Sequence, residues 1–344
     1  MKKALVVRLG AYGDMIQISP LLRKLKEDGY YVSVYTKKRA QPVLLHNPRV
    51  DEIIIHDDTI KPEELPELYK KLETQCDRFI NLSGSIEGGL LKIQGTMEYE
   101  WPKWKRHVEC NVNYVDRTMS VGGYESKGEA TELFFSLTEE RQAKKLKQKH
   151  KGKFFILWAL AGSSYHKAYP YAEYVARAIL NAHEDVVIYT VGDAFTQLIE
   201  WQHPRTHNAS DLWSIRKTMS MTKYADLVIG PETGVLNAAG CFDTPKIIFL
   251  SHSTEENLSK YWKNVNPIIP SVDCYPCHRL IYENEQCELE PGIKSPICAS
   301  RIPWRLVVNE IEAVYKKWRE KKWGHYMSGT EHSMKRMENC MAAR

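Results

Sequence analysis

The sequence has 344 residues, of which 43% are hydrophobic and 26% charged, a composition that excludes a disordered or fibrous chain and allows two domains of ordinary size. Its net charge of +5 is too small to indicate nucleic-acid binding, so we expect no nucleic-acid partner. The sequence lacks the roughly 18 consecutive apolar residues of a membrane span, and no cleavage site follows the short apolar run near its start, so we expect a cytoplasmic protein.

Apolar runs and helical patterns alternate through the first part of the chain. The runs that read as strands are residues 3–9, 31–36, 51–57 and 78–83. An amphipathic pattern predicts a helix over residues 16–26, and such alternation indicates parallel βαβ units. The stretch 84–128 is less regular, with a helix-like pattern over 108–121. The charged stretch 138–153 predicts a solvated helix and linker.

The same rhythm returns in the second part. The runs that read as buried strands are residues 153–160, 185–191, 225–230 and 245–250. Helices are predicted over 170–184 and 303–322. The pattern favours an α/β protein with two Rossmann-like, doubly wound domains that face a central cleft, with ligands at the carboxyl ends of the strands. We expect domains over 1–150 and 151–302, a terminal helix over 303–323 and a tail over 324–344.

The first strand runs into a glycine turn, "RLGAYGD". Gly10 and Gly13 allow a sharp turn. Asp14 stands where a helix begins, so its carboxylate either caps that helix or performs chemistry. The third glycine of a dinucleotide-binding fingerprint is absent, which disfavours a redox enzyme.

Two later strand ends also carry polar groups. "LAGSSYHKAYPYAEY" places hydroxyls and Lys167 after a strand, which suits a diphosphate but is also typical of a polar surface loop. We expect the neighbouring His166 to face solvent. "ADLVIGPETGVLNAAG" ends a strand and starts a helix, where the N–H groups of Thr233 and Gly234 can attract an anion or belong to an ordinary capped helix.

These stretches together resemble glycosyltransferase family 9, the heptosyltransferase-like enzymes. The match is carried by "RLGAYGDMIQISPLLRKL", "GSSYHKAYP" and "ADLVIGPETGVLNAAGCFDTPKIIFLS", which come in the family's order across most of residues 3–320. The resemblance implies a GT-B fold with the acceptor on the first domain and a nucleotide-sugar donor on the second. It also implies inverting sugar transfer that requires no cofactor and no catalytic metal.

The resemblance assigns roles to single residues. Asp14 matches the proposed general base, which takes the proton of the acceptor hydroxyl. Lys167, with the N–H groups of Thr233 and Gly234, would stabilise the leaving nucleoside diphosphate. The other residues expected around the donor are Gly13, Ser163, Ser164, Gly192, Glu232 and Asn237.

The sequence departs from the family's pattern at three places. Glu232 replaces an aspartate, Asn237 stands where a histidine is frequent, and Asp193 is out of register with an acidic residue that contacts the donor ribose. The donor therefore stays open, with ADP-heptose one of several nucleotide sugars, and so does the acceptor, a saccharide or glycolipid. Two alternatives also stay open: a non-catalytic nucleotide-sugar-binding protein and a GT-B nucleotide-sugar epimerase.

Three further features lie outside these motifs. The segment 274–298 contains four cysteines, which suit either a structural zinc site or free thiols: Cys274, Cys277, Cys287 and Cys298. The stretch 84–130, with Trp101 and Trp104, is our candidate for acceptor contacts. The basic, tryptophan-containing end "YKKWREKKWGHYMSGTEHSMKRMENCMAAR" is either a solvated helix and tail or a contact with an anionic membrane at its inner face.

Overall fold

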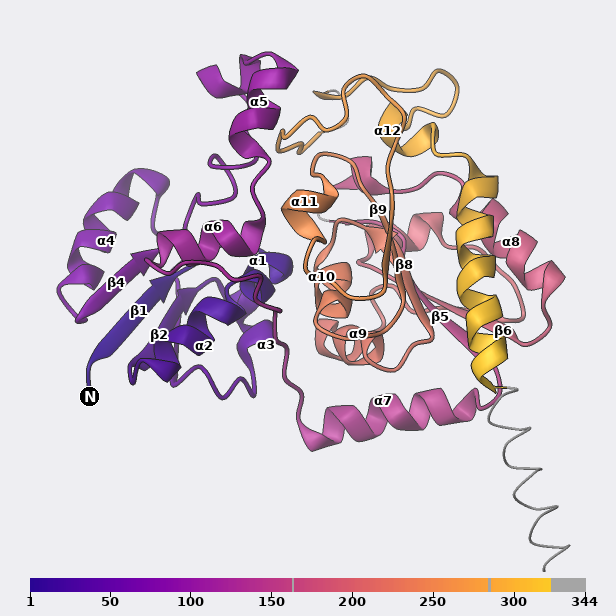
Figure 1. Ribbon diagram of the computed structural model, residues 1–344, viewed down its shortest axis with the longest axis horizontal. Coiled ribbons are helices and arrows are strands. Elements are labelled where there is room, and N and C mark those ends of the chain that lie inside the picture. The colour runs from indigo at the N-terminus through magenta and orange to yellow at the C-terminus, as the bar shows by residue number, and fades with distance from the viewer. Residues whose placement is uncertain (163, 284–285, 323–344) are drawn as a thin grey trace, which may run out of the picture.

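The chain forms two lobes, each built on a parallel sheet covered by helices (Figure 1). The computed structural model describes residues 1–322 except 163, 284 and 285. We call the part that contains the four-stranded sheet the first lobe and the part that contains the six-stranded sheet the second lobe. Two parallel α/β sheets agree with the predicted fold class.

The sheet of the first lobe has the strand order β3-β2-β1-β4. Its strands are β1 (Lys3–Val7), β2 (Tyr31–Thr36), β3 (Glu52–Ile55) and β4 (Arg78–Asn81). All pairs are parallel, and Val6 of β1 lies opposite Val34 and Ile80 on its two neighbours. The four strands expected in this part of the chain are confirmed.

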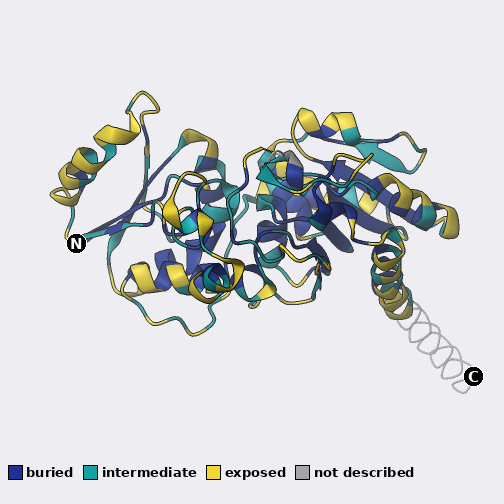
Figure 2. Ribbon diagram, turned by 90° about the horizontal axis from the view of Figure 1, so that it is seen from above, coloured by how far each residue is buried: buried dark blue, intermediate teal, exposed yellow. Residues whose placement is uncertain are grey.

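The sheet of the second lobe has the order β10-β9-β8-β5-β6-β7 and is also parallel. The predicted strands are β5 (Phe154–Ala159), β6 (Val186–Val191), β8 (Leu227–Pro231) and β9 (Lys246–Phe249). Every residue of β5 and β6 is buried, in the dark interior of Figure 2. Chain order reverses between β5 and β8, where doubly wound sheets bind ligands.

The sequence analysis missed the two edge strands, β7 (Thr206–Asn208) and β10 (Val265–Ile268). The first has only polar side chains, and the second contains Pro267, a residue tolerated mainly at sheet edges. Neither carries the apolar pattern by which buried strands are recognised.

Two helical predictions in the first lobe were wrong in their extent. The helix expected over 16–26 is two helices, α1 (Tyr12–Gln17) and α2 (Ser19–Glu27), because the chain turns at Ile18 and Pro20 opens the second one. The pattern over 108–121 also spans two helices, α5 (Lys103–Cys110) and α6 (Tyr114–Val121). Asn113 separates them, and its side chain accepts a hydrogen bond from the N–H of Val115.

The remaining helices connect and cover the sheets. The first lobe also contains α3 (Gln41–Leu44) and α4 (Leu65–Glu73). The later ones are α7 (Leu137–Lys149), α8 (Ala172–Ala182), α9 (Ile215–Thr222), α10 (Gly234–Gly240), α11 (Glu255–Leu258) and α12 (Ile297–Ser300). A helix over 304–322 packs its apolar face on the core of the second lobe. The domain boundary near residue 151 stays a prediction.

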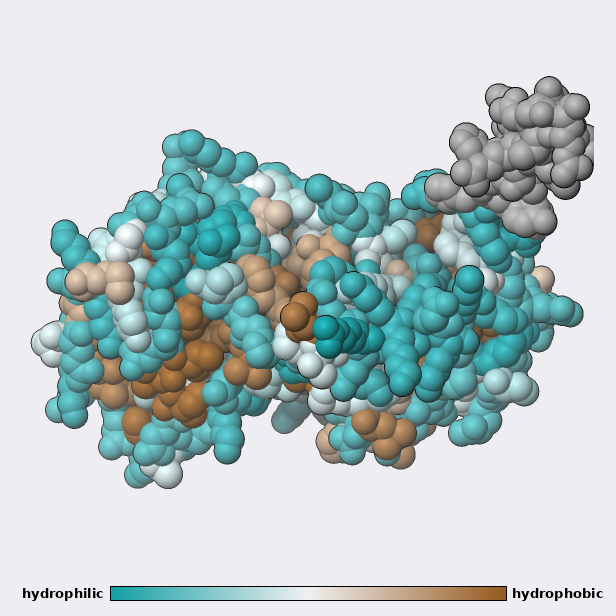
Figure 3. Space-filling view, turned by 90° about the horizontal axis from the view of Figure 1, so that it is seen from below, coloured by the Kyte–Doolittle hydropathy of each residue, from teal (hydrophilic) through white to brown (hydrophobic). Residues whose placement is uncertain are grey.

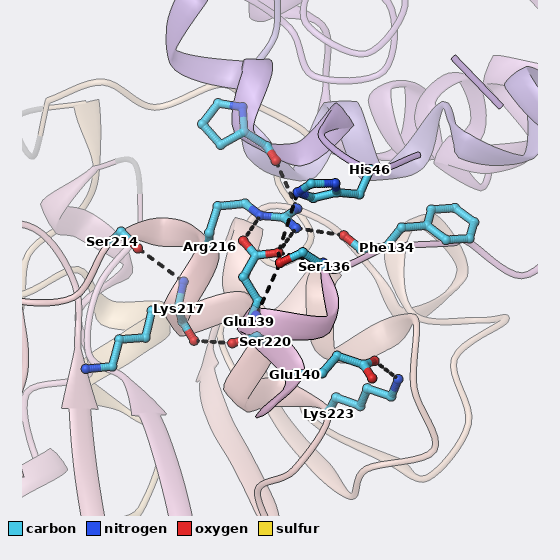
Figure 4. Close-up of polar contacts among 11 residues, drawn as sticks. His46, Phe134, Ser136, Glu139, Glu140, Ser214, Arg216, Lys217, Ser220 and Lys223 are labelled. Atoms are coloured by element: carbon cyan, nitrogen blue, oxygen red, sulfur yellow. Dashed lines mark hydrogen bonds and ion pairs between the residues drawn. The ribbon is translucent and has the colours of Figure 1, made fainter. Parts of the chain in front are cut away.

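Arg216 of α9, on the second lobe, forms hydrogen bonds to the start of α7 and to the first lobe (Figure 4). Its guanidinium donates to both carboxylate oxygens of Glu139, at 2.7 and 2.6 Å, and to the carbonyl oxygens of Pro42 and Phe134. The guanidinium also lies 4.8 Å from the ring centre of Phe135. One buried arginine thus holds three segments that are distant in sequence.

The surface seen from below is mixed (Figure 3): hydrophobic residues gather on the first lobe, while the second lobe is mostly hydrophilic. Within residues 1–322, apart from those left undescribed, no helix combines the length and apolarity needed to cross a bilayer. The basic end for which membrane contact was considered begins at Tyr315; its residues 315–322 belong to a helix, and residues 323–344 lie outside the described residues.

Candidate active site

Asp14 lies in the first turn of α1, just past the carboxyl end of β1. The N-cap position belongs to Ala11, and Asp14 is the third helical residue. Its Oδ2 accepts a 2.6 Å hydrogen bond from the N–H of Ala11, so the carboxylate does cap the helix, but from the third position and not from the N-cap. A Cβ on Gly10 would come within 2.6 Å of Asp14 Oδ2. Because Gly10 has no Cβ, it leaves the space that the Asp14 carboxylate occupies.

Arg8 holds the other oxygen of Asp14. Arg8 Nη2 lies 2.8 Å from Asp14 Oδ1, and Arg8 Nη1 lies 2.8 Å from an oxygen of Glu87. Although burial alone would lower the pKa of Arg8, the two carboxylates raise it above its ordinary value. A permanently charged, buried arginine thus lies between two carboxylates.

Lys167 lies on the second lobe, in the turn after β5. Its Nζ donates to the carbonyl oxygen of Glu232 at 3.1 Å. Burial lowers the pKa of Lys167, while the charges of Glu232 and Asp14 act in the opposite direction. The ammonium and the Asp14 carboxylate therefore lie within electrostatic reach across the two lobes.

The helices α1 and α10 bring the lobes together beside these groups. A Cβ on Gly13 would lie 2.8 Å from Asn237 Nδ2, and one on Gly234 would lie 2.7 Å from Tyr12 Cβ. Asn237 Oδ1 also accepts a hydrogen bond from Gln17 at 3.1 Å. Asn237, expected near the donor, is thus engaged in the contact between the lobes.

Thr233 caps α10: its hydroxyl oxygen accepts a hydrogen bond from the N–H of Leu236 at 3.3 Å. Its Cγ2 lies 3.2 Å from where a Cβ on Gly162 would stand. The start of α10 and the Lys167 turn are therefore packed side by side.

The side chain of Glu232 points into its own lobe. Oε1 accepts hydrogen bonds from the N–H groups of Ser251 and Ser253 at 2.7 and 3.2 Å, and Oε2 lies 2.7 Å from His252 Nε2. Burial alone would raise the pKa of Glu232, but His252, Lys167 and the Ser251 N–H together lower it to about 2. This carboxylate therefore fixes the loop after β9 and leaves its backbone carbonyl to Lys167.

His166 is buried, with 2% of its surface exposed, so the expectation that it faces solvent was wrong. Its Nδ1 lies 2.7 Å from the hydroxyl oxygen of Ser164. Burial, together with the charge of Lys167, lowers the pKa of His166 to about 3. A neutral imidazole thus packs beneath Lys167. Ser163, also expected at the donor, lies outside the described residues.

The turn after β6 holds Gly192 and Asp193. A Cβ on Gly192 would lie 2.3 Å from the hydroxyl oxygen of Thr196. The Asp193 carboxylate accepts hydrogen bonds from the backbone N–H and the hydroxyl of Thr196. Asp193 is thus engaged with Thr196 at the start of the short helix Phe195–Ile199, and its register relative to a ribose contact stays a prediction.

The four cysteines of segment 274–298 all carry thiols that burial makes weaker acids. Burial raises the pKa of Cys277 to about 12 and that of Cys287 to about 11, and neighbouring cysteine sulfurs act in the same direction. Yet among the residues that the structure describes, no group of three or more histidine, cysteine or acidic side chains is arranged to hold a metal ion.

The irregular stretch 84–130 forms a hollow of about 610 Å³ on the first lobe. Its lining includes Lys92, Trp101, Glu109, Arg117 and Glu125. Trp104, which was also expected to contact the acceptor, is 69% exposed and does not line this hollow.

Sequence reasoning missed several groups near Asp14 and Lys167. Arg8 stands in the quoted glycine-turn motif, and Glu87 is the acidic residue of the glycine-containing loop "GSIEGG" after a predicted strand. The position of each residue, one in the motif and one in a loop after a strand, could therefore have identified it as a candidate from the sequence. The phenol of Tyr114, buried and 2.5 Å from the Ser253 hydroxyl, had no such signal. Burial and the charge of Glu232 raise the pKa of Tyr114 well above its ordinary value.

Comparison with known proteins points to one class of fold. No family model matches the sequence, and no curated protein matches it. A family 9 glycosyl transferase from Veillonella parvula is similar in structure, with TM-score 0.63 and 14% identity over 92% of this chain and 97% of that one. The ADP-heptose LPS heptosyltransferase II of E. coli is similar with TM-score 0.63 and 16% identity over 92% and 99%.

A third similar structure is the iron-containing dodecameric glycosyltransferase TibC of enterotoxigenic E. coli, with TM-score 0.56 and 10% identity over 92% of this chain and 77% of that one. These likenesses show that the chain has the GT-B fold of family 9 glycosyltransferases. The resemblance noticed in the sequence is thereby confirmed at the level of the fold.

Proposed function

We propose that this protein is a glycosyltransferase that moves a sugar from a nucleoside-diphosphate donor to a saccharide or glycolipid acceptor. The observation that carries the proposal is that the Asp14 carboxylate, held by Arg8 on the first lobe, and the Lys167 ammonium on the second lobe lie within electrostatic reach of each other. One is suited to accept a proton and the other to bind an anion.

Transfer with inversion is one displacement at the anomeric carbon. The acceptor hydroxyl attacks, Asp14 takes its proton, and the bond to the diphosphate breaks. A positioned base of this kind typically contributes about 10²–10⁴-fold to the rate. Arg8 and the Ala11 N–H fix the orientation of the carboxylate before the acceptor arrives.

The leaving diphosphate gains negative charge as the bond breaks. Lys167 and the N–H groups at the start of α10, at Thr233 and Gly234, are the donors available to it on the second lobe. The half-buried position of Lys167 strengthens such an interaction relative to water. No metal ion is required in this scheme.

The first lobe would bind the acceptor. The hollow lined by Lys92, Trp101 and Arg117 also contains carboxylates, and such mixed donors and acceptors suit sugar hydroxyls. One of the similar structures is a heptosyltransferase named for ADP-heptose, so ADP-heptose is the first donor to test.

The decisive test compares the wild type with Asp14→Asn. We expect Asp14→Asn to bind ADP-heptose or ADP normally and to lose transfer by about 10²-fold or more. Wild-type transfer by this variant would refute the assignment of the base. A screen of nucleotide sugars by mass spectrometry, with and without acceptors, tests the two alternatives: binding without turnover indicates a non-catalytic protein, and an epimer formed without acceptor indicates an epimerase.

Two expectations outside the reaction remain proposals. Structural zinc at the cysteines rests on the Cys-x2-Cys spacing and on the closeness of the thiols. Contact of the basic tail with an anionic membrane rests on composition alone. Vesicles with and without phosphatidylserine, compared for binding of the full chain and of a chain ending at residue 322, test the second.

A further inference from the structure

A second carboxylate, Glu87, lies next to the proposed base. It is joined to Asp14 through Arg8, whose two terminal nitrogens each lie 2.8 Å from one carboxylate. The Arg8 side chain is 3% exposed, whereas those of Asp14 and Glu87 are 17% and 30% exposed. The arginine is therefore the buried centre of the trio, and both acids are in part exposed to solvent.

The loop that carries Glu87 is built to hold it there. Gly84 and Gly88 on either side have positive φ values of 78° and 82°, which favour glycine. The Gly88 N–H donates to the carbonyl oxygen of Leu91 at 2.7 Å, and a Cβ on Gly89 would lie 2.3 Å from the Ser85 carbonyl oxygen. These contacts restrict the backbone of the loop and so keep Glu87 beside Arg8.

The net charge of the three side chains affects how well Asp14 can accept a proton. Arg8 and Asp14 alone would be a neutral pair, in which the cation weakens the carboxylate as a proton acceptor. With Glu87 on the other nitrogen, the trio carries one net negative charge, which favours uptake of a proton by Asp14. The carbonyl oxygen of Leu82, 3.1 Å from Arg8 Nη1, helps to fix the plane of the guanidinium.

We propose that Glu87 is a positioning residue for the reaction: through Arg8 it orients Asp14 and keeps that carboxylate basic enough to take the acceptor proton. The inference rests on the proposed function. The other charged or titratable groups that interact electrostatically with these acids are Lys167 and the phenols of Tyr114 and Tyr282. None of these three is bonded to Arg8 in the described contacts.

The test is Glu87→Gln, which keeps the size and a carbonyl oxygen for Arg8 and removes the charge. We expect kcat to fall about tenfold and the acid limb of the kcat/KM profile to move to lower pH, because the negative charge beside Arg8 is lost. Glu87→Asp should restore part of the rate. Glu63→Gln, an exposed glutamate of the same lobe, is the matched control and should leave both unchanged.

A readout without turnover accompanies the kinetics. In protein labelled with ¹³C at aspartate carboxyls, the resonance missing from Asp14→Asn belongs to Asp14, and it should titrate at lower pH in Glu87→Gln. Unchanged titration and an unchanged acid limb, with Asp14→Asn inactive, overturn the role of Glu87 alone. An inactive Glu87→Gln with an active Asp14→Asn overturns both proposals, because Glu87 is then the base.

Discussion

Gly13 of the first lobe and Asn237 of the second lobe are in contact, with the Asn237 amide nitrogen 2.8 Å from the point where a Cβ on Gly13 would stand. The asparagine is held from behind, since its Nδ2 donates to the Thr233 carbonyl oxygen at 2.9 Å. The two lobes therefore meet at a point with no space for a methyl group.

We predict that Gly13→Ala destabilises the protein by about 1–3 kcal/mol, because the added methyl forces the amide of Asn237 away. Urea unfolding of four proteins measures the coupling: wild type, Gly13→Ala, Asn237→Ala and the double variant. Since Asn237→Ala makes the space that Gly13→Ala needs, the double variant should lose less than the sum of the two single losses. Strict additivity would contradict the contact.

The Arg216–Glu139 pair predicts a dependence of stability on pH. The hydrogen bond from Arg216 is the main cause that lowers the pKa of Glu139 from 4.5 to about 2. A carboxyl whose pKa is lower in the folded state stabilises the fold above pH 4.5, and this contribution is lost as the pH falls towards 2. We expect Glu139→Gln to lose about 2–3 kcal/mol at pH 7 and much less at pH 2.5.

The neighbouring Glu140 supplies the control. It pairs with Lys223 at 2.5 Å, with side chains 24% and 38% exposed, so Glu140→Gln should cost less than about 1 kcal/mol. Unfolding by urea from pH 2.5 to 7 compares the two variants. Equal losses at pH 7 would show that the buried arginine adds nothing to the Glu139 contact.

From the charge and burial of Lys167 we predict how the affinity for the donor changes on substitution and at high pH. Lys167→Ala should weaken binding of ADP about tenfold or more, because a charge-assisted hydrogen bond to phosphate is lost. Burial is the main cause that lowers the pKa of Lys167, so in the wild type ADP affinity should fall at a lower pH than an ordinary lysine would dictate. Calorimetry at several pH values measures both effects.

A lysine of the first lobe whose side chain is 42% exposed, Lys24, pairs with Glu27 and is the matched control for the calorimetry. Lys24→Ala should bind ADP as the wild type does. If Lys167→Ala and Lys24→Ala bind ADP equally well, Lys167 is not part of the phosphate site.

The cysteines predict a pattern of thiol reactivity. Cys274 is exposed, whereas burial raises the pKa of Cys277 to about 12, so in metal-free protein at neutral pH iodoacetamide should label Cys274 first. Mass spectrometry of the alkylated protein follows each site. If the proposed zinc site forms, equimolar zinc protects all four thiols of the segment together; protection of none would refute it.

The sequence predicted the buried parallel strands correctly, but it did not predict the direction in which individual side chains point. Apolar runs located β5 and β6, because strands buried on both faces read as continuous hydrophobic segments. The same reading gave no sign that Glu232 turns away from the gap, since its partners, the N–H groups of Ser251 and Ser253, belong to a loop that β9 brings beside it. Contacts of that kind are set by tertiary packing.

The candidate site, too, contains some residues whose positions the sequence predicted and others whose positions it did not. The positions of Asp14 and Lys167 could be predicted because each follows a strand, and parallel strands end at a common edge; their roles stay a prediction. His166 was misjudged because local polarity predicts exposure, whereas Ser164 and the loop around His252 bury it. Glu87 acts through Arg8, a side chain some eighty positions away, and short sequence patterns do not report such a distance.

The two hydrogen bonds from the loop after β9 to Glu232 have a consequence for protein engineering. An aspartate at this position is one methylene shorter and would leave the Ser251 and Ser253 amides without their acceptor. We therefore expect Glu232→Asp in this chain to release the loop. Designs that change residue 232 should redesign residues 251–253 at the same time.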